Sequence, residues 1–109
     1  MTREEQIAIE IKDVVDTLAS EYEAERVILF GSRANGQTCE ESDVDLVVIK
    51  ETALGLYDRL KEVARLCRWT HAFEILVYTS EEFAQMSQKN SFIREEIIEK
   101  GKVLYERVA

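Results

Sequence analysis

The sequence predicts one domain of the α/β (α+β) class, in which helices pack around a small sheet. Three observations support this fold class. The chain has 109 residues, enough for a single small domain over 1–109. Its composition is 46% hydrophobic and 33% charged, which suits a packed core with a solvated surface. Segments with apolar residues at helical spacing alternate along the chain with short β-branched runs.

The first half of the chain predicts a helix followed by two strands. Residues 3–20 form an amphipathic pattern, whose repeating apolar residues are Ile7, Ile11, Val14, Val15 and Leu18. The apolar run "RVILF" at 26–30 predicts a central strand that ends at Gly31. Residues 32–42 are polar and favour turns, with room for one short helical turn. The run "DVDLVVIK" at 43–50 predicts the second strand.

The second half predicts three more helices and one or two strands. A helix is expected over 53–68, with an inner face made of Leu56, Leu60, Val63, Ala64 and Cys67. Residues 72–79 predict a third strand, and Ser80 resembles the N-cap of the helix that follows it. A last helix over 91–100 stops at Gly101, and 102–106 can add a short edge strand.

Composition excludes several classes of function. The net charge is −8, with acids and bases interleaved, so no basic track for extensive nucleic-acid binding is expected. The longest apolar runs are too short to span a membrane, and the charged N-terminus lacks the apolar stretch of a signal peptide. Cys39 and Cys67 are too few for a disulfide framework and are expected as reduced thiols. These features favour a cytoplasmic protein.

Acidic residues occur near the start of two predicted strands. Asp43 and Asp45 are two residues apart, so their side chains share one face of the strand. Glu74 lies between two apolar residues of the third strand and is expected to point away from the face that they bury. If the strands adjoin, the three carboxylates converge and repel each other unless cations lie between them. Mg²⁺ prefers such ligands, and a bridging pair can hold two ions about 3.5–4 Å apart.

Residues 31–33, which precede the two aspartates in the chain, favour a metal site over the alternative that the acids merely solvate the edge of a strand. Gly31 directly follows a predicted strand and lets the backbone approach a ligand closely. The hydroxyl of Ser32 and nearby backbone N–H groups can hold phosphate oxygens, and Arg33 adds a positive charge for the same group. A strand, Gly-Ser, ten intervening residues, two aspartates on a second strand and an acid in a third strand form a much rarer combination than any one of these features alone.

The segments "GSRANG" and "SDVDLVV" resemble those of the minimal nucleotidyltransferases of the DNA polymerase beta superfamily. The resemblance is most specific over 27–49 and extends more loosely across nearly the whole chain. It implies a small mixed sheet flanked by helices that binds ATP and Mg²⁺. Gly31 and Ser32 would hold the β- and γ-phosphates. Asp43, Asp45 and Glu74 would be the catalytic metal ligands, with Glu74 standing where the family more often has aspartate.

The resemblance also implies a biological role. Proteins of this kind are commonly paired with a HEPN ribonuclease toxin and act as its antitoxin, by transferring AMP from ATP to a toxin tyrosine. The motifs and the sheet use most of the 109 residues, so the acceptor is expected to come from another molecule. A homo- or hetero-oligomer is compatible with this interpretation.

Two alternatives stay open at this point. The first is a non-catalytic antitoxin, or binding module, that neutralises its partner by forming a complex with it. The second is a transferase that modifies a small molecule of the aminoglycoside type, which is disfavoured because the chain is short for building such a pocket alone.

Three other residues are candidates that the metal site does not need. His71 is interpreted as a loop or strand-edge residue, and Trp69 as a core aromatic rather than a base-stacking one. Cys39 has no partner at zinc-ligand spacing. The segment from 91 to 106 either offers Phe92, Ile93 and Ile97 to a partner or buries them in the core.

Overall fold

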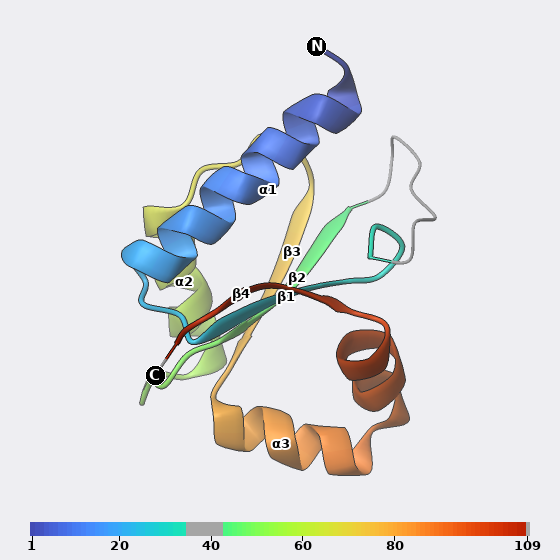
Figure 1. Cartoon of the computed structure of the whole chain (residues 1–109). Coiled ribbons are helices and arrows are strands. Elements are labelled where there is room, and N and C mark those ends of the chain that lie inside the picture. The colour runs from blue at the N-terminus through green and yellow to red at the C-terminus, as the bar shows by residue number, and fades with distance from the viewer. Residues whose placement is uncertain (35–42, 109) are drawn as a thin grey trace.

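The computed structural model describes residues 1–34 and 43–108 and contains one mixed sheet with helices on both faces. Figure 1 shows the elements, which follow one another as α1 (Arg3–Ser20), β1 (Arg26–Phe30), β2 (Val44–Ile49), α2 (Leu56–Leu66), β3 (Phe73–Tyr78), α3 (Ser80–Lys89), the π-helix η1 (Ile93–Glu99) and β4 (Lys102–Glu106). The fold class predicted from the sequence is confirmed, and so is the edge strand at 102–106.

The sheet has four strands in the order β3-β2-β1-β4. β1 pairs antiparallel with both β2 and β4, whereas β2 and β3 run parallel. A parallel pair needs a crossover connection, and α2 supplies it. The crossover places the N-terminal ends of β2 and β3 at the same end of the sheet, beside the C-terminal end of β1 (Figure 1).

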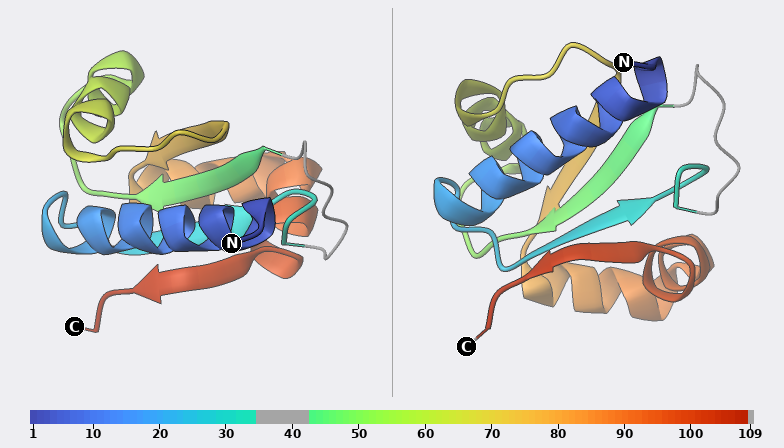
Figure 2. Two further views of the ribbon diagram at one scale, coloured as in Figure 1. Left: turned by 90° about the horizontal axis from the view of Figure 1, so that it is seen from above. Right: turned by 45° about the horizontal axis from the view of Figure 1, so that its top comes forward.

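Each face of the sheet has its own core. α1 and α2 cover one face, where Ile7, Leu18, Val44, Leu46 and Val63 are among the buried side chains. α3 and η1 cover the other face, and its buried residues are Ile28, Phe30, Val47, Ile49, Phe83, Ile93 and Ile97. Figure 2 shows the two layers of helices with the sheet between them. The alternation along β2 places Val44 and Leu46 on the α1/α2 face and leaves Asp45 on the α3/η1 face.

Side-chain caps fix the start of two helices. The Thr2 side chain accepts from the backbone N–H of Glu5 at the start of α1, and the Glu5 carboxylate accepts from Thr2 in return. Thr79 and Glu82 make the same reciprocal cap at α3. The prediction that Ser80 is the N-cap is therefore wrong by one residue. The Ser80 hydroxyl instead donates to Glu51 over 2.7 Å.

The predicted inner face of the second helix is wrong for three of its five residues. Val63 and Cys67 are buried as expected, but Leu56 is 56% exposed, Leu60 is 40% exposed, and Ala64 is exposed. The helix turns its 59, 63 and 67 positions toward the sheet, so Arg59 is buried in place of a leucine. The leucines are displaced around the helix toward the edge strand β3, where Leu56 and Leu60 line a groove with Leu76 and Tyr78.

The predicted last helix is present over Ile93–Glu99 but is wound as a π-helix. Ile93 and Ile97 are buried, which confirms the core interpretation for these two residues, whereas Phe92 is exposed and its contact with a partner stays a prediction. Within the described ranges, no helix has the length and apolar character needed to cross a membrane.

Candidate active site

A tight turn at the end of β1 forms the first part of the site. Gly31 has φ of +81°, in the region that favours glycine, and the backbone N–H of Ala34 donates to its carbonyl over 3.1 Å. A side chain at position 31 would also collide with the Asp45 carboxylate. The backbone conformation therefore favours glycine here, and any side chain would also force the Asp45 carboxylate to move.

Asp45 and Glu74 form the centre of the site. They lie directly opposite each other in the parallel register of β2 and β3, so both side chains are on the α3/η1 face. Partial burial, the charge of Glu74, a hydrogen bond with Glu74 and the charge of Asp43 together raise the pKa of Asp45 to about 6. The sequence prediction that β2 and β3 adjoin and bring these acids together is confirmed for this pair.

Asp43 is exposed and lies one residue before the start of β2. It affects Asp45 through its charge, as a weaker influence than Glu74. Within residues 1–34 and 43–108, no three acidic, histidine or cysteine side chains already form a group that could enclose a metal ion. The structure therefore brings two of the three predicted ligands into contact and leaves the third beside them.

The donor chemistry of the pair nevertheless fits a hard divalent cation. Two carboxyl groups are in contact with a third negative charge nearby, and these charges add to the larger effect of burial in raising the pKa of Asp45. A cation bound to their oxygens would relieve this repulsion, and oxygen ligands are those that Mg²⁺ prefers. Asp45 and Glu74 are the residues that could hold it, with Asp43 as the further ligand.

Ser32 and Arg33 follow Gly31 in the turn but differ in their surroundings. Ser32 is half-buried, next to the glycine. The guanidinium of Arg33 is 3.0 Å from the Glu4 carboxylate, and the residue is only 8% exposed. Arg33 thus ties the turn to the first turn of α1. Its predicted contact with phosphate stays a prediction.

The other sequence candidates have structural roles. Glu10 of α1 accepts from the backbone N–H groups of Thr70 and His71, and its carboxylate is 3.3 Å from the His71 ring, so His71 belongs to a loop held by α1. The Trp69 ring stacks on Phe73 at 5.6 Å between centroids and packs against the core. Both interpretations made from the sequence are confirmed. Burial raises the pKa of the Cys67 thiol to about 11, and Cys39 lies outside the described residues.

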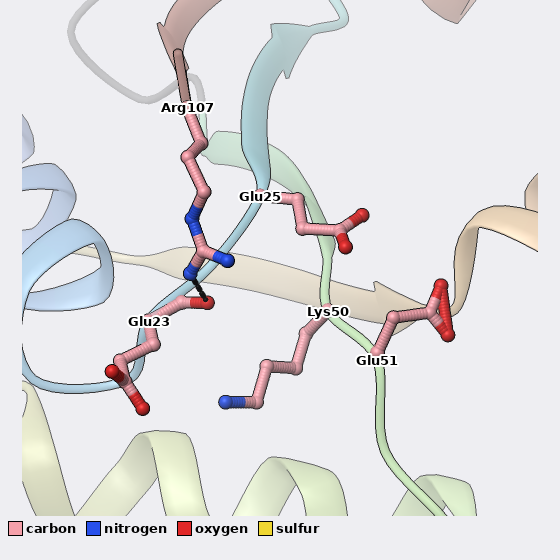
Figure 3. Close-up of a pocket in the computed structure, with 5 residues that line it drawn as sticks. All are labelled: Glu23, Glu25, Lys50, Glu51 and Arg107. Atoms are coloured by element: carbon pink, nitrogen blue, oxygen red, sulfur yellow. Dashed lines mark hydrogen bonds between the residues drawn. The ribbon is translucent and has the colours of Figure 1, made fainter. Parts of the chain in front are cut away.

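A polar cavity of about 150 Å³ lies at the opposite end of the sheet and contains none of the predicted site residues (Figure 3). Its two cations are already engaged with backbone carbonyls. Arg107 donates to the carbonyl of Glu23 over 2.6 Å, and Lys50 donates to that of Tyr22 over 2.6 Å. These two hydrogen bonds attach the C-terminal segment and the end of β2 to the connection between α1 and β1. The cations that line the cavity therefore have a structural role.

Two residues, Glu4 and Arg59, hold other parts of the fold in place through ion pairs and were not identified from the sequence. Glu4 lies on the first turn of α1 and pairs with Arg33, although they are 29 residues apart in the sequence. Arg59 of α2 is buried and pairs with Glu82 of α3. No local pattern links such distant pairs. The one available signal was the position of Arg59 four residues before Val63, on the same face of the helix.

A glycine turn, two acids paired across adjacent strands and a four-stranded mixed sheet are the features that the sequence resemblance to nucleotidyltransferases leads us to expect. Comparison with known proteins agrees with this class. Residues 12–108 match the family model described as "Polymerase beta, Nucleotidyltransferase". The chain belongs to this family and is a nucleotidyltransferase.

Relatives and solved structures are consistent with the family. Two proteins of Methanocaldococcus jannaschii, both named "Putative protein adenylyltransferase", are 32% and 33% identical to the chain. The first alignment covers 87% of this chain and 94% of the relative, and the second covers 83% and 88%.

Two solved structures share the fold. A structure titled as a "putative nucleotidyltransferase" from Sulfolobus solfataricus has a TM-score of 0.65 and 20% identity, over 96% of this chain and 85% of that one. A structure titled "toxin-antitoxin with AMP-PNP" has a TM-score of 0.51 and 15% identity, over 88% and 73%.

Proposed function

We propose that the protein transfers AMP from ATP to a hydroxyl group of a partner protein, in a reaction that depends on Mg²⁺. The observation that carries the proposal is the contact between Asp45 and Glu74 beside the glycine turn. Two relatives named as protein adenylyltransferases support a protein acceptor. The fold shared with a structure titled as a toxin–antitoxin complex supports the further proposal that the chain is an antitoxin. The family resemblance in the sequence motivates the proposal that the acceptor is a tyrosine of a HEPN-type toxin.

The residues have distinct roles in the proposed reaction. Gly31 and Ser32 would present backbone N–H groups and a hydroxyl to the phosphates, while Asp43, Asp45 and Glu74 would hold up to two Mg²⁺ ions. The bound ions would neutralise charge on the phosphates and activate the attacking hydroxyl. The acceptor oxygen forms a bond to the α-phosphorus, the bond from that phosphorus to the bridging oxygen breaks, and pyrophosphate leaves. Glu74 helps to remove the proton of the hydroxyl. Catalysis is mainly positioning and charge neutralisation.

The test uses ATP labelled at the α-phosphate together with a candidate partner protein that is produced in the same cells as the chain. Asp45→Asn and Asp43→Asn are each expected to reduce label transfer at least about a hundredfold, the upper end of the loss caused by removing a group that merely supports a metal ligand. Asp58→Asn is the matched control, because Asp58 is exposed on the first turn of α2, away from the pair. Circular dichroism of each variant checks that the fold is retained.

The mass of the partner separates the enzyme from the binding module. A gain of one AMP mass that requires ATP and Mg²⁺ supports the transferase. Undiminished transfer by Asp45→Asn rules out the proposed site. Complete neutralisation of the partner without any change in its mass rules out adenylyl transfer as the basis of antitoxin action.

A further inference from the structure

Phe92 is a large apolar side chain at the start of η1 that remains 52% exposed. Its ring centroid is 6.4 Å from that of Phe30, and the two rings are nearly perpendicular. Phe30 is the last residue of β1, next to Gly31, and it pairs with Asp45 across β1 and β2. Residues directly opposite in an antiparallel pair share a face of the sheet. Phe92 therefore lies one aromatic contact away from the carboxylate pair, on the same face.

The backbone at Phe92 is held firmly. The N–H of Phe92 donates to the Asn90 side chain over 2.9 Å. The next residue, Ile93, is 4% exposed, and Ile97 is 1% exposed, so both anchor η1 to the sheet. In Figures 1 and 2, η1 lies beneath the end of β1 from which the glycine turn leaves. An aromatic ring on a fixed backbone loses little freedom when a flat ligand stacks on it.

We propose that Phe92 is the stacking platform for the nucleotide base of the substrate. This inference rests on the proposed function and extends it to the base. The phosphates would lie at the Gly31 turn and the carboxylate pair, while the base lies on the open part of the Phe92 ring. Stacking on an aromatic side chain is tolerant of base identity, because every base has a π-face. This platform therefore contributes affinity for ATP and GTP alike.

The test compares nucleotide binding with binding of the phosphates alone, by calorimetry in the presence of Mg²⁺. Phe92→Ala is expected to raise the Kd for ATP about tenfold, within the range measured when a stacking aromatic is replaced by alanine. The same variant leaves the Kd for inorganic tripolyphosphate unchanged. Ile98→Ala is the matched control, because Ile98 is 50% exposed on the same helix. In transfer assays, Phe92→Ala raises KM for ATP and leaves kcat close to the wild-type value.

A second variant gives a direct signal. Phe92→Trp keeps a stacking ring and is expected to bind ATP as well as the wild type, with a change in its fluorescence on addition of ATP. Wild-type protein supplies the baseline, since its single tryptophan, Trp69, packs against Phe73. If Phe92→Ala and Ile98→Ala bind ATP with equal affinity, Phe92 is not the stacking platform. The same conclusion follows if Phe92→Ala loses binding to the partner while its affinity for ATP is unchanged. Those results leave the proposed function intact, whereas wild-type protein that neither binds ATP nor transfers AMP overturns the function itself.

Discussion

Asp45 shows how the site affects stability at the scale of one residue. Its pKa is raised from 3.8 to about 6, first by partial burial and then by Glu74. The folded state therefore binds this proton more tightly than the unfolded state. Below about pH 4 the group is protonated in both states and has no effect, whereas above about pH 6 it is ionised in both. Between these values, the free energy of unfolding falls as pH rises.

Removal of the charge is consequently expected to stabilise the protein at neutral pH. Asp45→Asn should raise the free energy of unfolding at pH 7, with EDTA present, by about 1 kcal/mol. This is less than the full pKa difference implies, because solvent reaches the carboxyl and screens it. At pH 3.5 the gain should disappear. Denaturation in urea at both pH values measures it, with Asp58→Asn as the control. A gain that is equal at both pH values would contradict the explanation.

At the scale of elements, an ion pair joins the two layers of helices around the edge strand β3. Arg59 extends from α2 and donates to the backbone carbonyl of Val77 in β3 over 3.2 Å. The same guanidinium makes two hydrogen bonds to Glu82 of α3, at 2.7 and 3.1 Å. α2 and α3 lie on opposite faces of the sheet, so this pair spans its edge. The Glu82 carboxylate also accepts from the backbone N–H of Thr79 at the start of α3, which links the cap to the ion pair.

This ion pair predicts a specific sensitivity to acid. Arg59 is the main cause that lowers the pKa of Glu82 from 4.5 to about 2. A lowered acid pKa stabilises the fold above about pH 4.5, and this contribution is lost as pH falls toward 2. Glu82→Gln should therefore lower the free energy of unfolding at pH 7 by about 1 kcal/mol and flatten its decline in acid. This loss is far less than the full pKa difference implies, because the Glu82 side chain is 42% exposed and solvent screens the pair. Circular dichroism during acid titration measures this decline.

The matched control for this prediction is Glu81→Gln, because Glu81 is exposed on the same first turn of α3. Its acid profile should follow that of the wild type. If Glu82→Gln also follows the wild type between pH 4.5 and 2, the ion pair does not stabilise the fold in the way that its geometry implies.

The orientation of α2 shows why part of this arrangement could not be predicted. Periodicity identifies the helix and two of the three buried positions on its sheet-facing side, Val63 and Cys67, but not Arg59. Periodicity predicts that Leu56 and Leu60 are buried and that Arg59 is not, because it considers the hydrophobicity of each side chain without its partners. Burial of Arg59 becomes favourable only once Val77 and Glu82 offer it oxygen atoms, and those partners are 18 and 23 residues away in the sequence.

At the scale of the whole molecule, the positions of the candidate site residues could be predicted from the sequence more fully than the packing of the helices around them. Alternation along each strand fixes the face on which Asp45 and Glu74 lie, and the glycine turn follows from Gly31 itself. The contact between the two acids also required β2 and β3 to be neighbours in exact register, which the sequence only made possible. The pairing of Arg33 with Glu4 depends on where α1 crosses the sheet, and no local pattern encodes that crossing.

The net charge of the whole chain predicts that nucleic acid is not the acceptor of the transferred AMP. With 22 acidic and 14 basic residues, the protein repels a phosphate backbone at long range. Non-specific binding of nucleic acid depends on cations that neutralise phosphates, and typical Kd values are about 10⁻⁴–10⁻⁶ M. We expect no binding of labelled duplex DNA or RNA by fluorescence anisotropy at about 10 μM protein in low salt, a condition that favours electrostatic attachment. Binding that weakens steeply with added salt would reveal a local basic surface that the net charge conceals, and it would make a nucleic-acid acceptor a rival to the protein hydroxyl.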